Sequence, residues 1–341
     1  MKIYKLCIAL FIILIFLNSE ISFFAQALDQ EQEDLKNKEK VQSLNFSGKK
    51  EIKDLLPTIS SYPNLSRLDL SNSFLQNEDL IHINNPRISY LNLNNTLING
   101  NEFSFISKLP QLKNLSMEGT YINNSILPAI AKLEYLEKLE IGKSYVTDNG
   151  IKALQKSKLS ILDLSALKIS NDSIESICKM PNIQELYLWN TKITSKEFSN
   201  ITNLKKLKVL MLGGTEIDNE ALNYISKIPN LKFLNVSWTK VTDDGLEYLK
   251  DNQSIEVLSL NGNKITKTGI KSISKMKKLK ILSMEDILLS GDYSSNFSEF
   301  PRLKVLYLNN VSINKKSIDI LVRKLPWVAV YYNGTLMFNE D

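Results

Sequence analysis

The residues best suited to chemistry are few and far apart in this sequence. Its 341 residues include one histidine, His82, and two cysteines, Cys7 and Cys178. A nucleophilic triad needs a histidine beside the nucleophile, and a zinc site needs several Cys or His ligands. We therefore expect His82 to be a surface or packing residue and Cys178 to be a partly buried structural thiol. No catalytic residue, metal, cofactor or enzymatic activity is expected.

The composition excludes further classes of protein. Hydrophobic residues make up 43% and charged residues 23%, which is typical of a chain that folds. The net charge of +5 is too balanced to indicate a nucleic-acid binder. The sequence contains no Walker loop, no GxGxxG and no GxSxG motif, and two cysteines cannot make a disulfide scaffold.

Residues 1–27 have the pattern of a secretory signal peptide. Two lysines precede an apolar run over residues 6–17, and Ala25-Gln26-Ala27 offers a small-x-small cleavage signal. The run is shorter than the about 20 residues of an easy bilayer span, although a retained signal anchor stays open. We expect a secreted or extracytoplasmic protein, in the periplasm or on the cell surface, with no membrane span after cleavage. Residues 28–40 are expected to form a polar leader or N-terminal cap.

An apolar-x-x-apolar-x-apolar triplet recurs along the rest of the chain, as in Leu65-Leu68-Leu70 and Leu207-Leu210-Leu212. Counting a weaker copy at Val41, there are twelve copies, and their starts are 24 residues apart except for two intervals of 23. The first residues of the copies are Val41, Leu65, Ile88, Leu112, Leu136, Leu159, Ile183, Leu207, Leu231, Ile255, Leu279 and Leu303. A period of this length indicates a repeat architecture.

Two periodicities lie within each unit when the first residue of the triplet is numbered position 1. Positions 4 and 6 alternate with polar neighbours, which predicts a short strand. Positions 16, 19 and 22 are mostly apolar, which predicts one face of a short α- or 3₁₀-helix. Thr242 and Ser170 are expected to be helix N-caps, because acidic residues follow each of them.

No single unit can bury its apolar face alone, so the units must stack on one continuous core. The predicted fold class is α/β, a horseshoe-shaped solenoid with a parallel sheet on the concave face and short helices on the convex face. We expect the repeats over residues 41–326 and a C-terminal cap over 327–341. Within that cap, Tyr332-Asn333-Gly334 predicts a turn.

The pattern resembles the leucine-rich-repeat family over about residues 41–333. Position 9, usually Asn in that family, is Asn only at Asn263 and is Thr or Ser in seven other copies, whose hydroxyls are expected to bond backbone amides. The run from Thr239 to Leu246 is similar to ribonuclease-inhibitor-like repeats, which also occur in F-box-associated and bacterial exported proteins. Because no F-box segment is present, the resemblance gives little support to an F-box-like ubiquitin-ligase adaptor.

Positions 3, 5 and 7 are expected to point out of the concave face, since 4 and 6 point inward. In the C-terminal half these positions carry large apolar side chains, which favour a protein partner, although β-propensity alone would also select Val and Ile. The predicted partner-binding residues are Tyr187, Trp189, Met211, Phe233, Trp238 and Tyr307. A lysine row at position 10, interrupted by Glu216, suits either an acidic partner or a solvated loop.

These observations predict an exported, monomeric leucine-rich-repeat protein that binds a protein ligand through its concave face. A host-directed factor of a bacterium is the role we expect from this architecture. A glycan- or envelope-binding module is the alternative, with Tyr187, Trp189 and Tyr307 stacking on sugars. Neither hypothesis involves nucleic acid.

Overall fold

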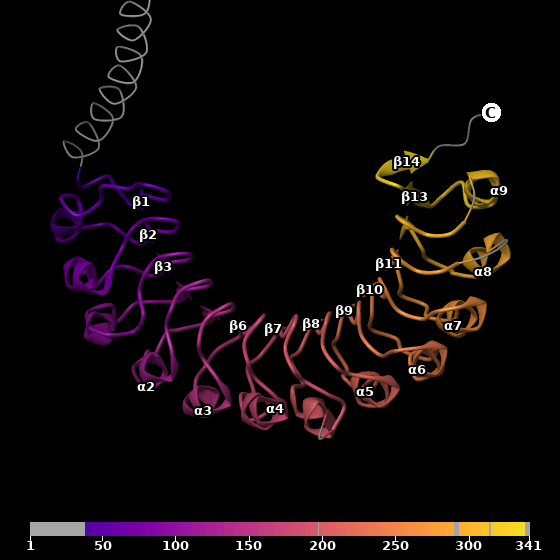
Figure 1. Cartoon of the computed structure of the whole chain (residues 1–341), viewed down its shortest axis with the longest axis horizontal. Coiled ribbons are helices and arrows are strands. Elements are labelled where there is room, and N and C mark those ends of the chain that lie inside the picture. The colour runs from indigo at the N-terminus through magenta and orange to yellow at the C-terminus, as the bar shows by residue number, and fades with distance from the viewer. Residues whose placement is uncertain (1–37, 197, 290–292, 314, 338–341) are drawn as a thin grey trace, which may run out of the picture.

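The computed structural model describes residues 38–196, 198–289, 293–313 and 315–337. Over these ranges short strands and short helices alternate along an arc, with the strands on the inner, concave face and the helices on the outer, convex face (Figure 1). The predicted α/β horseshoe is therefore confirmed. The expected signal peptide and most of the polar leader lie outside the described residues.

The strands form one sheet of fourteen in chain order within the described part. Strands β1 to β13 are parallel, and each residue pairs with the one 23 or 24 positions later, whereas β14 is antiparallel to β13 across the turn at Asn333-Gly334. The strands are β1 Ser43–Asn45, β2 Arg67–Asp69, β3 Tyr90–Asn92, β4 Asn114–Ser116, β5 Lys138–Glu140, β6 Ile161–Asp163, β7 Glu185–Tyr187, β8 Val209–Met211, β9 Phe233–Asn235, β10 Val257–Ser259, β11 Ile281–Ser283, β12 Val305–Tyr307, β13 Ala329–Tyr332 and β14 Thr335–Met337.

The convex side mixes 3₁₀- and α-helices, as the three-residue spacing of the apolar positions predicts. Most are shorter than two turns, and no helix of the described residues combines the length and apolar character that crossing a membrane requires. The 3₁₀-helices are η1 Leu56–Ser61, η2 Asn77–His82, η3 Phe103–Lys108, η4 Asn124–Ile126, η5 Lys152–Leu154 and η6 Phe198–Asn203. The α-helices are α2 Leu127–Ile130, α3 Asp148–Ile151, α4 Asn171–Ile177, α5 Asn219–Ile225, α6 Asp243–Glu247, α7 Lys267–Ile273, α8 Ser294–Ser298 and α9 Lys315–Lys324.

One hydrophobic cluster runs through the interior from Leu44 to Val330. It contains the triplet residues at positions 1, 4 and 6 together with the aliphatic residue at position 11 and the helix residues at positions 16 and 19. In one repeat these are Leu207, Leu210 and Leu212 from the strand side and Leu222 and Ile225 from α5, all with no exposed surface. Burial of this set is what stabilises a strand of only three residues, because isolated short strands do not persist in water.

Position 8 of all twelve repeats has a positive φ angle, because the chain turns sharply after each strand. Asn and Gly, which tolerate the left-handed region, occupy most of these positions. The exceptions are Lys143, Ala166, Trp238 and Asp286, with φ between 52° and 57°. Trp238 is the bulkiest of these residues, and it lies at the edge of the concave face.

Each hydroxyl at position 9 donates to the carbonyl three residues earlier, at position 6, as in Thr96 to Leu93 O at 2.7 Å and Thr215 to Leu212 O at 2.6 Å. The hydroxyl thus closes its own turn. The expected bonds to backbone amides form at Ser144 and Thr239, which accept from Val146 N at 3.5 Å and Val241 N at 3.4 Å. Asn263 alone bridges two repeats, because its amide accepts from Thr239 N and donates to Val236 O.

A second ladder connects several repeats at position 13, where most of the convex helices begin. Asn219 accepts from the backbone N–H of Thr242 at 2.8 Å and donates to its hydroxyl at 2.9 Å. Asp148 accepts from both the backbone N–H of Ser170 at 2.9 Å and its hydroxyl at 3.1 Å. Thr242 and Ser170 do occupy N-cap positions, but neither side chain caps its own helix. The prediction of a side-chain capping bond is wrong at both residues, because each hydroxyl is already hydrogen-bonded to a side chain of the preceding repeat. Gly245 leaves room for Asn219, since an added Cβ would lie 2.5 Å from its Oδ1.

Candidate functional site: the concave face

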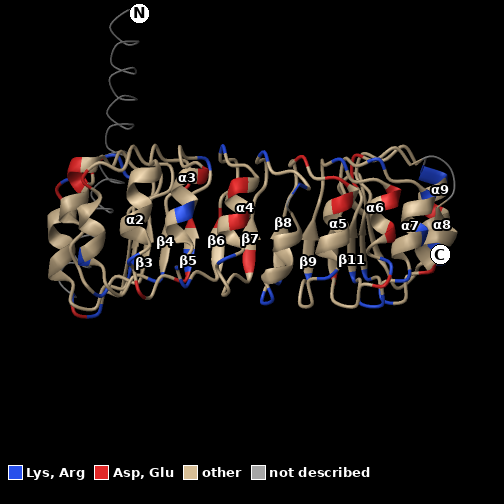
Figure 2. Ribbon diagram, turned by 90° about the horizontal axis from the view of Figure 1, so that it is seen from below, with Lys and Arg blue, Asp and Glu red and all other residues tan. Residues whose placement is uncertain are grey.

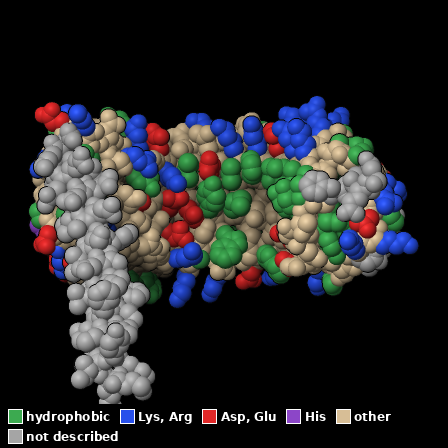
Figure 3. All heavy atoms as spheres, turned by 90° about the horizontal axis from the view of Figure 1, so that it is seen from above, with side chains coloured by type: hydrophobic (Ala, Val, Ile, Leu, Met, Phe, Trp, Pro, Cys, Tyr) green, Lys and Arg blue, Asp and Glu red, His purple; other side chains and the backbone are tan. Residues whose placement is uncertain are grey.

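The concave face is formed by side chains at positions 3, 5 and 7, which alternate with the buried leucines of each strand. Its surface changes along the arc, with acidic side chains near the middle and large apolar side chains beside them (Figure 3). Because the sheet is parallel and in register, residues at one position lie next to each other in neighbouring repeats, separated by the strand spacing of about 4.8 Å.

The structure brings five of the six predicted residues together over β7, β8 and β9. Tyr187 and Met211 are direct neighbours in the sheet, and Phe233 is the direct neighbour of Val209. Trp189 follows β7 and Trp238 follows β9. Trp189, Phe233 and Trp238 are 47%, 45% and 57% exposed, whereas Tyr187 and Met211 are partly buried. We call these five residues the aromatic cluster.

Each tryptophan of the cluster lies against a glycine 24 residues later. A Cβ added to Gly213 would lie 3.0 Å from Trp189 Cδ1, and one added to Gly262 would lie 2.3 Å from the Trp238 ring. The glycines thus provide space for the indoles, which rest on the neighbouring repeat and keep a large exposed area. This Trp-then-Gly pair, one period apart, is a sequence signal that our reading of single repeats missed.

Tyr307 does not join the aromatic cluster. It lies on β12, five strands from Tyr187, and the residues at the same position on the intervening strands β9 to β11 are Asn235, Ser259 and Ser283. Its ring stacks on Tyr331 of β13, with the ring centroids 4.9 Å apart. Tyr307 therefore belongs to a separate aromatic pair near the C-terminal end of the sheet.

Four carboxylates lie next to the aromatic cluster, on or just after strands β4 to β7, and we call them the acidic patch. They are Glu118, Glu140, Asp163 and Glu185. Lys143 Nζ lies 2.7 Å from Glu118 Oε1, and Lys138 Nζ lies 2.8 Å from Glu140 Oε1. All four carboxylates occupy positions 3, 5 or 7 of their repeats, which are the positions that point out of the concave face.

The pKa values of Asp163 in the acidic patch and Tyr187 in the aromatic cluster are both raised. Burial raises the pKa of Asp163, and the charges of Glu118 and Glu140 add to this effect, although Ser165 bonds its carboxylate and opposes it. The Tyr187 hydroxyl donates to Glu185 Oε2 at 2.8 Å. Burial and this bond raise the pKa of Tyr187 far above its ordinary value, so it remains a hydrogen-bond donor.

The position-10 row lies along the edge of the concave face, and its character changes midway. Lys168, Lys192 and Lys264 are exposed, and Lys240 pairs with Glu216 at 3.2 Å. In the N-terminal half the same position carries exposed apolar side chains, which are Phe74, Leu97, Tyr121 and Tyr145. The lysine row is therefore confined to the second half of the arc.

Cys178 and His82 lie on the convex side, away from the concave face. Cys178 is buried at the end of α4, and burial raises the pKa of its thiol to about 12, so the nucleophilic thiolate is scarce at neutral pH. His82 ends η2 and is exposed. Within the described ranges, no group of three or more His, Cys, Asp or Glu side chains could hold a metal ion.

Comparison with known proteins adds the family of the repeats. Residues 227–250 and 251–274 each match the family model described as leucine-rich repeat. A solved internalin from Listeria monocytogenes is similar over 82% of this chain and 89% of its own, with 18% identity and a TM-score of 0.52. No curated protein matches the sequence.

A second similar structure is the leucine-rich-repeat ectodomain of a plant membrane receptor kinase from Arabidopsis thaliana, solved in complex with Casparian strip integrity factor 2. The match covers 85% of this chain but 38% of that chain, with 17% identity and a TM-score of 0.53. At such identities the likeness concerns the fold. The matched repeats, the parallel in-register sheet and these neighbours together establish the chain as a leucine-rich-repeat solenoid.

Proposed function

We propose that this chain binds a protein ligand through the aromatic cluster and the acidic patch of its concave face. The observation that carries the proposal is the gathering of Trp189, Phe233 and Trp238, all about half exposed, over three adjacent strands. Tryptophan and other large aromatic side chains supply most of the binding energy at protein interfaces, and exposing several of them together in water is unfavourable unless a partner covers them.

The acidic patch indicates the charge of the ligand. Four carboxylates face two lysines there, and Asp163 and Glu185 have no ion-pair partner within the described residues. A ligand that places a Lys or Arg side chain beside an apolar side chain would match both surfaces. Charge of opposite sign would speed its association, and that effect would weaken at high salt.

Support also comes from the plant receptor ectodomain, a similar scaffold that was solved in complex with Casparian strip integrity factor 2. Residues 1–27 carry the features of a signal peptide, so we propose an exported chain with a polar leader at 28–40, repeats over 41–326 and a cap over 327–341. In a bacterium, a host-directed role would suit such a protein. The monomeric state is part of the same proposal.

The test starts from capture of exported or host-surface proteins on the immobilised chain, followed by titration of each purified candidate. We expect Trp189→Ala combined with Phe233→Ala to weaken binding at least 100-fold, at about 2 kcal/mol or more for each anchor. Tyr248→Ala is the matched control, because Tyr248 is a similarly exposed aromatic residue at the end of convex helix α6.

Equal binding by the double variant would remove the aromatic cluster from consideration. Binding to a glycan array that requires the same two residues and survives high salt would instead favour the glycan-binding alternative. Export is tested separately by cell fractionation and N-terminal sequencing, which should show a mature chain beginning near residue 28.

A further inference from the structure

The two edges of the solenoid differ strongly in charge. One edge is formed by twelve loops, each of which connects a convex helix to the next strand. Each loop comprises positions 21 to 24 and the first two positions of the following repeat, and we call this edge the basic rim. They span 61–66, 85–89, 108–113, 132–137, 156–160, 179–184, 203–208, 227–232, 251–256, 275–280, 299–304 and 323–328. These loops hold twenty basic and five acidic residues, whereas the opposite edge, at positions 8 to 13, holds ten basic and six acidic residues.

Blue loops mark the basic rim along the lower edge of Figure 2, and the loops end at a similar level beneath β8 to β11. Few of its cations are neutralised by the protein. Among the described residues, three of the twenty form ion pairs with a carboxylate: Lys158 with Glu134, Lys179 with Glu175 and Lys280 with Glu256. The charge of the rim is therefore available to a ligand.

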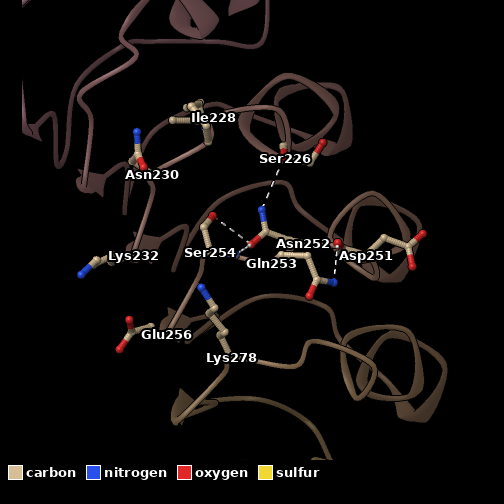
Figure 4. Close-up of a pocket in the computed structure, with 11 residues that line it drawn as sticks. Ser226, Ile228, Asn230, Lys232, Asp251, Asn252, Gln253, Ser254, Glu256 and Lys278 are labelled. Atoms are coloured by element: carbon tan, nitrogen blue, oxygen red, sulfur yellow. Dashed lines mark hydrogen bonds between the residues drawn. The ribbon is translucent and has the colours of Figure 1, made fainter.

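The hollows between neighbouring loops place these cations beside neutral hydrogen-bond donors. One hollow of about 350 Å³ lies between the loops 227–232 and 251–256, and its polar lining includes Asn230, Lys232, Ser254 and Lys278 together with the carboxylates of Asp251 and Glu256 (Figure 4). Asn252 holds its loop in shape, because its amide oxygen accepts from the backbone N–H groups of Ser254 and Ile255. Two lysines and two carboxylates balance within this hollow, so the surplus positive charge of the rim comes from the neighbouring loops.

A large aromatic side chain lies on the same edge. Trp327 is 60% exposed and lines a second hollow with Arg302, Lys304 and Lys280. Its position corresponds to position 1, which is a buried aliphatic residue in every repeat from Leu65 onward. Tryptophan beside lysine and arginine is the combination that stabilises proteins at the headgroup level of a bilayer.

We propose that the basic rim docks this protein onto an anionic lipid surface, with the lysines on the headgroups and Trp327 inserted between them. A flat surface fits better than a flexible polymer, because loops that end at one level can contact a plane simultaneously. The concave face stays open in this orientation, since it is perpendicular to the rim. Docking through the rim is independent of the protein ligand proposed above.

The test is sedimentation of the full chain with vesicles of phosphatidylcholine alone and with 30% phosphatidylglycerol. We expect binding to the anionic vesicles that weakens with salt. Each rim lysine should contribute about 5-fold, so Lys232→Gln, Lys278→Gln and Lys304→Gln together should weaken binding about 100-fold. The matched control is Lys168→Gln, Lys192→Gln and Lys264→Gln, three exposed lysines on the opposite edge, with less than about 3-fold expected.

Both triple variants retain the apolar residues 6–17. Any contribution of these residues to vesicle binding is therefore the same in the two variants and cancels when they are compared. Equal loss in the two variants would overturn the proposal, as would equal binding to neutral and anionic vesicles by the unmodified chain. Inositol hexaphosphate identifies a soluble phosphate ligand: if it binds at the rim while anionic vesicles do not, the lipid surface is refuted. Trp327→Ala should weaken vesicle binding several-fold and leave the response to inositol hexaphosphate unchanged.

Discussion

Trp238 allows a sharp test of how the edge of the concave face is built. Its φ of 57° lies in the left-handed region, where a residue with a Cβ is strained by about 1 kcal/mol and glycine is not. The equivalent residues in the repeats before and after it are Gly214 and Gly262, both with positive φ. We therefore compare Trp238→Gly with Trp238→Ala, because both remove the indole and only one keeps the strain.

The magnitudes follow from the exposure of the side chain. Trp238 is 57% exposed, so its covered area is on the order of 100 Å², which is worth about 2.5 kcal/mol of burial. Trp238→Ala loses this contribution, whereas Trp238→Gly recovers about 1 kcal/mol from the backbone. We expect Trp238→Gly to be the more stable variant by about 1 kcal/mol, and both variants to lose ligand binding by about 30-fold.

Urea unfolding followed by circular dichroism measures the stability difference. Tyr248 supplies the control pair, since its φ of −68° is helical and Tyr248→Gly should be less stable than Tyr248→Ala by about 0.5–1 kcal/mol. If Trp238→Ala proves as stable as Trp238→Gly, the argument from the left-handed backbone is refuted. If both variants fold and bind like the unmodified chain, Trp238 is not an anchor.

Three further predictions concern the inter-repeat ladder, the acidic patch and the thiol. Asn219→Ala should lower the free energy of unfolding by about 1–2 kcal/mol, because the backbone N–H of Thr242 loses its partner; Asn219→Asp, which keeps the acceptor, should lose less in the same urea titration. Asp163→Asn should raise the thermal midpoint at pH 7, since a raised pKa in the folded state means that the charged carboxylate opposes folding. That gain should fade as the pH falls through the raised pKa toward about 3.9, and a gain that grows on acidification would contradict the assignment. Cys178 should react with a thiol reagent at pH 8 only as fast as the chain opens locally, because burial raises its pKa to about 12; rapid, complete labelling of the folded protein would show an accessible thiolate.

Most of the architecture could be predicted from the apolar pattern alone. A buried leucine at positions 4 and 6 can only come from an extended segment, and apolar residues three apart can only share a face on a helix, so Leu210, Leu212, Leu222 and Ile225 already imply a strand and a helix. Equal spacing then implies stacking in register, because each unit buries the open face of the one before it. The aromatic positions could be assigned to the concave face by the same alternation.

The candidate site depended on contacts between repeats, which a reading of single repeats does not contain. Tyr307 has the right residue type and position, but its stacking on Tyr331 places it in another part of the face. Burial raises the pKa of Asp163, and carboxylates of two earlier repeats add to that shift. The basic rim also depends on several repeats, because each loop contributes only a few lysines and the stacking of the repeats joins them into a continuous edge.

The sequence by itself determined the period, the strand-and-helix alternation and the direction of each side chain, because these depend on backbone geometry within a single unit of 24 residues. The tertiary structure decided which residues act together. It placed the Trp189 and Trp238 side chains against glycines of the next repeat. It also bonded the N-cap residues Ser170 and Thr242 to side chains of the preceding repeat. The physical reason is that local sterics act within a few residues, whereas packing and hydrogen bonding here join residues one full period apart.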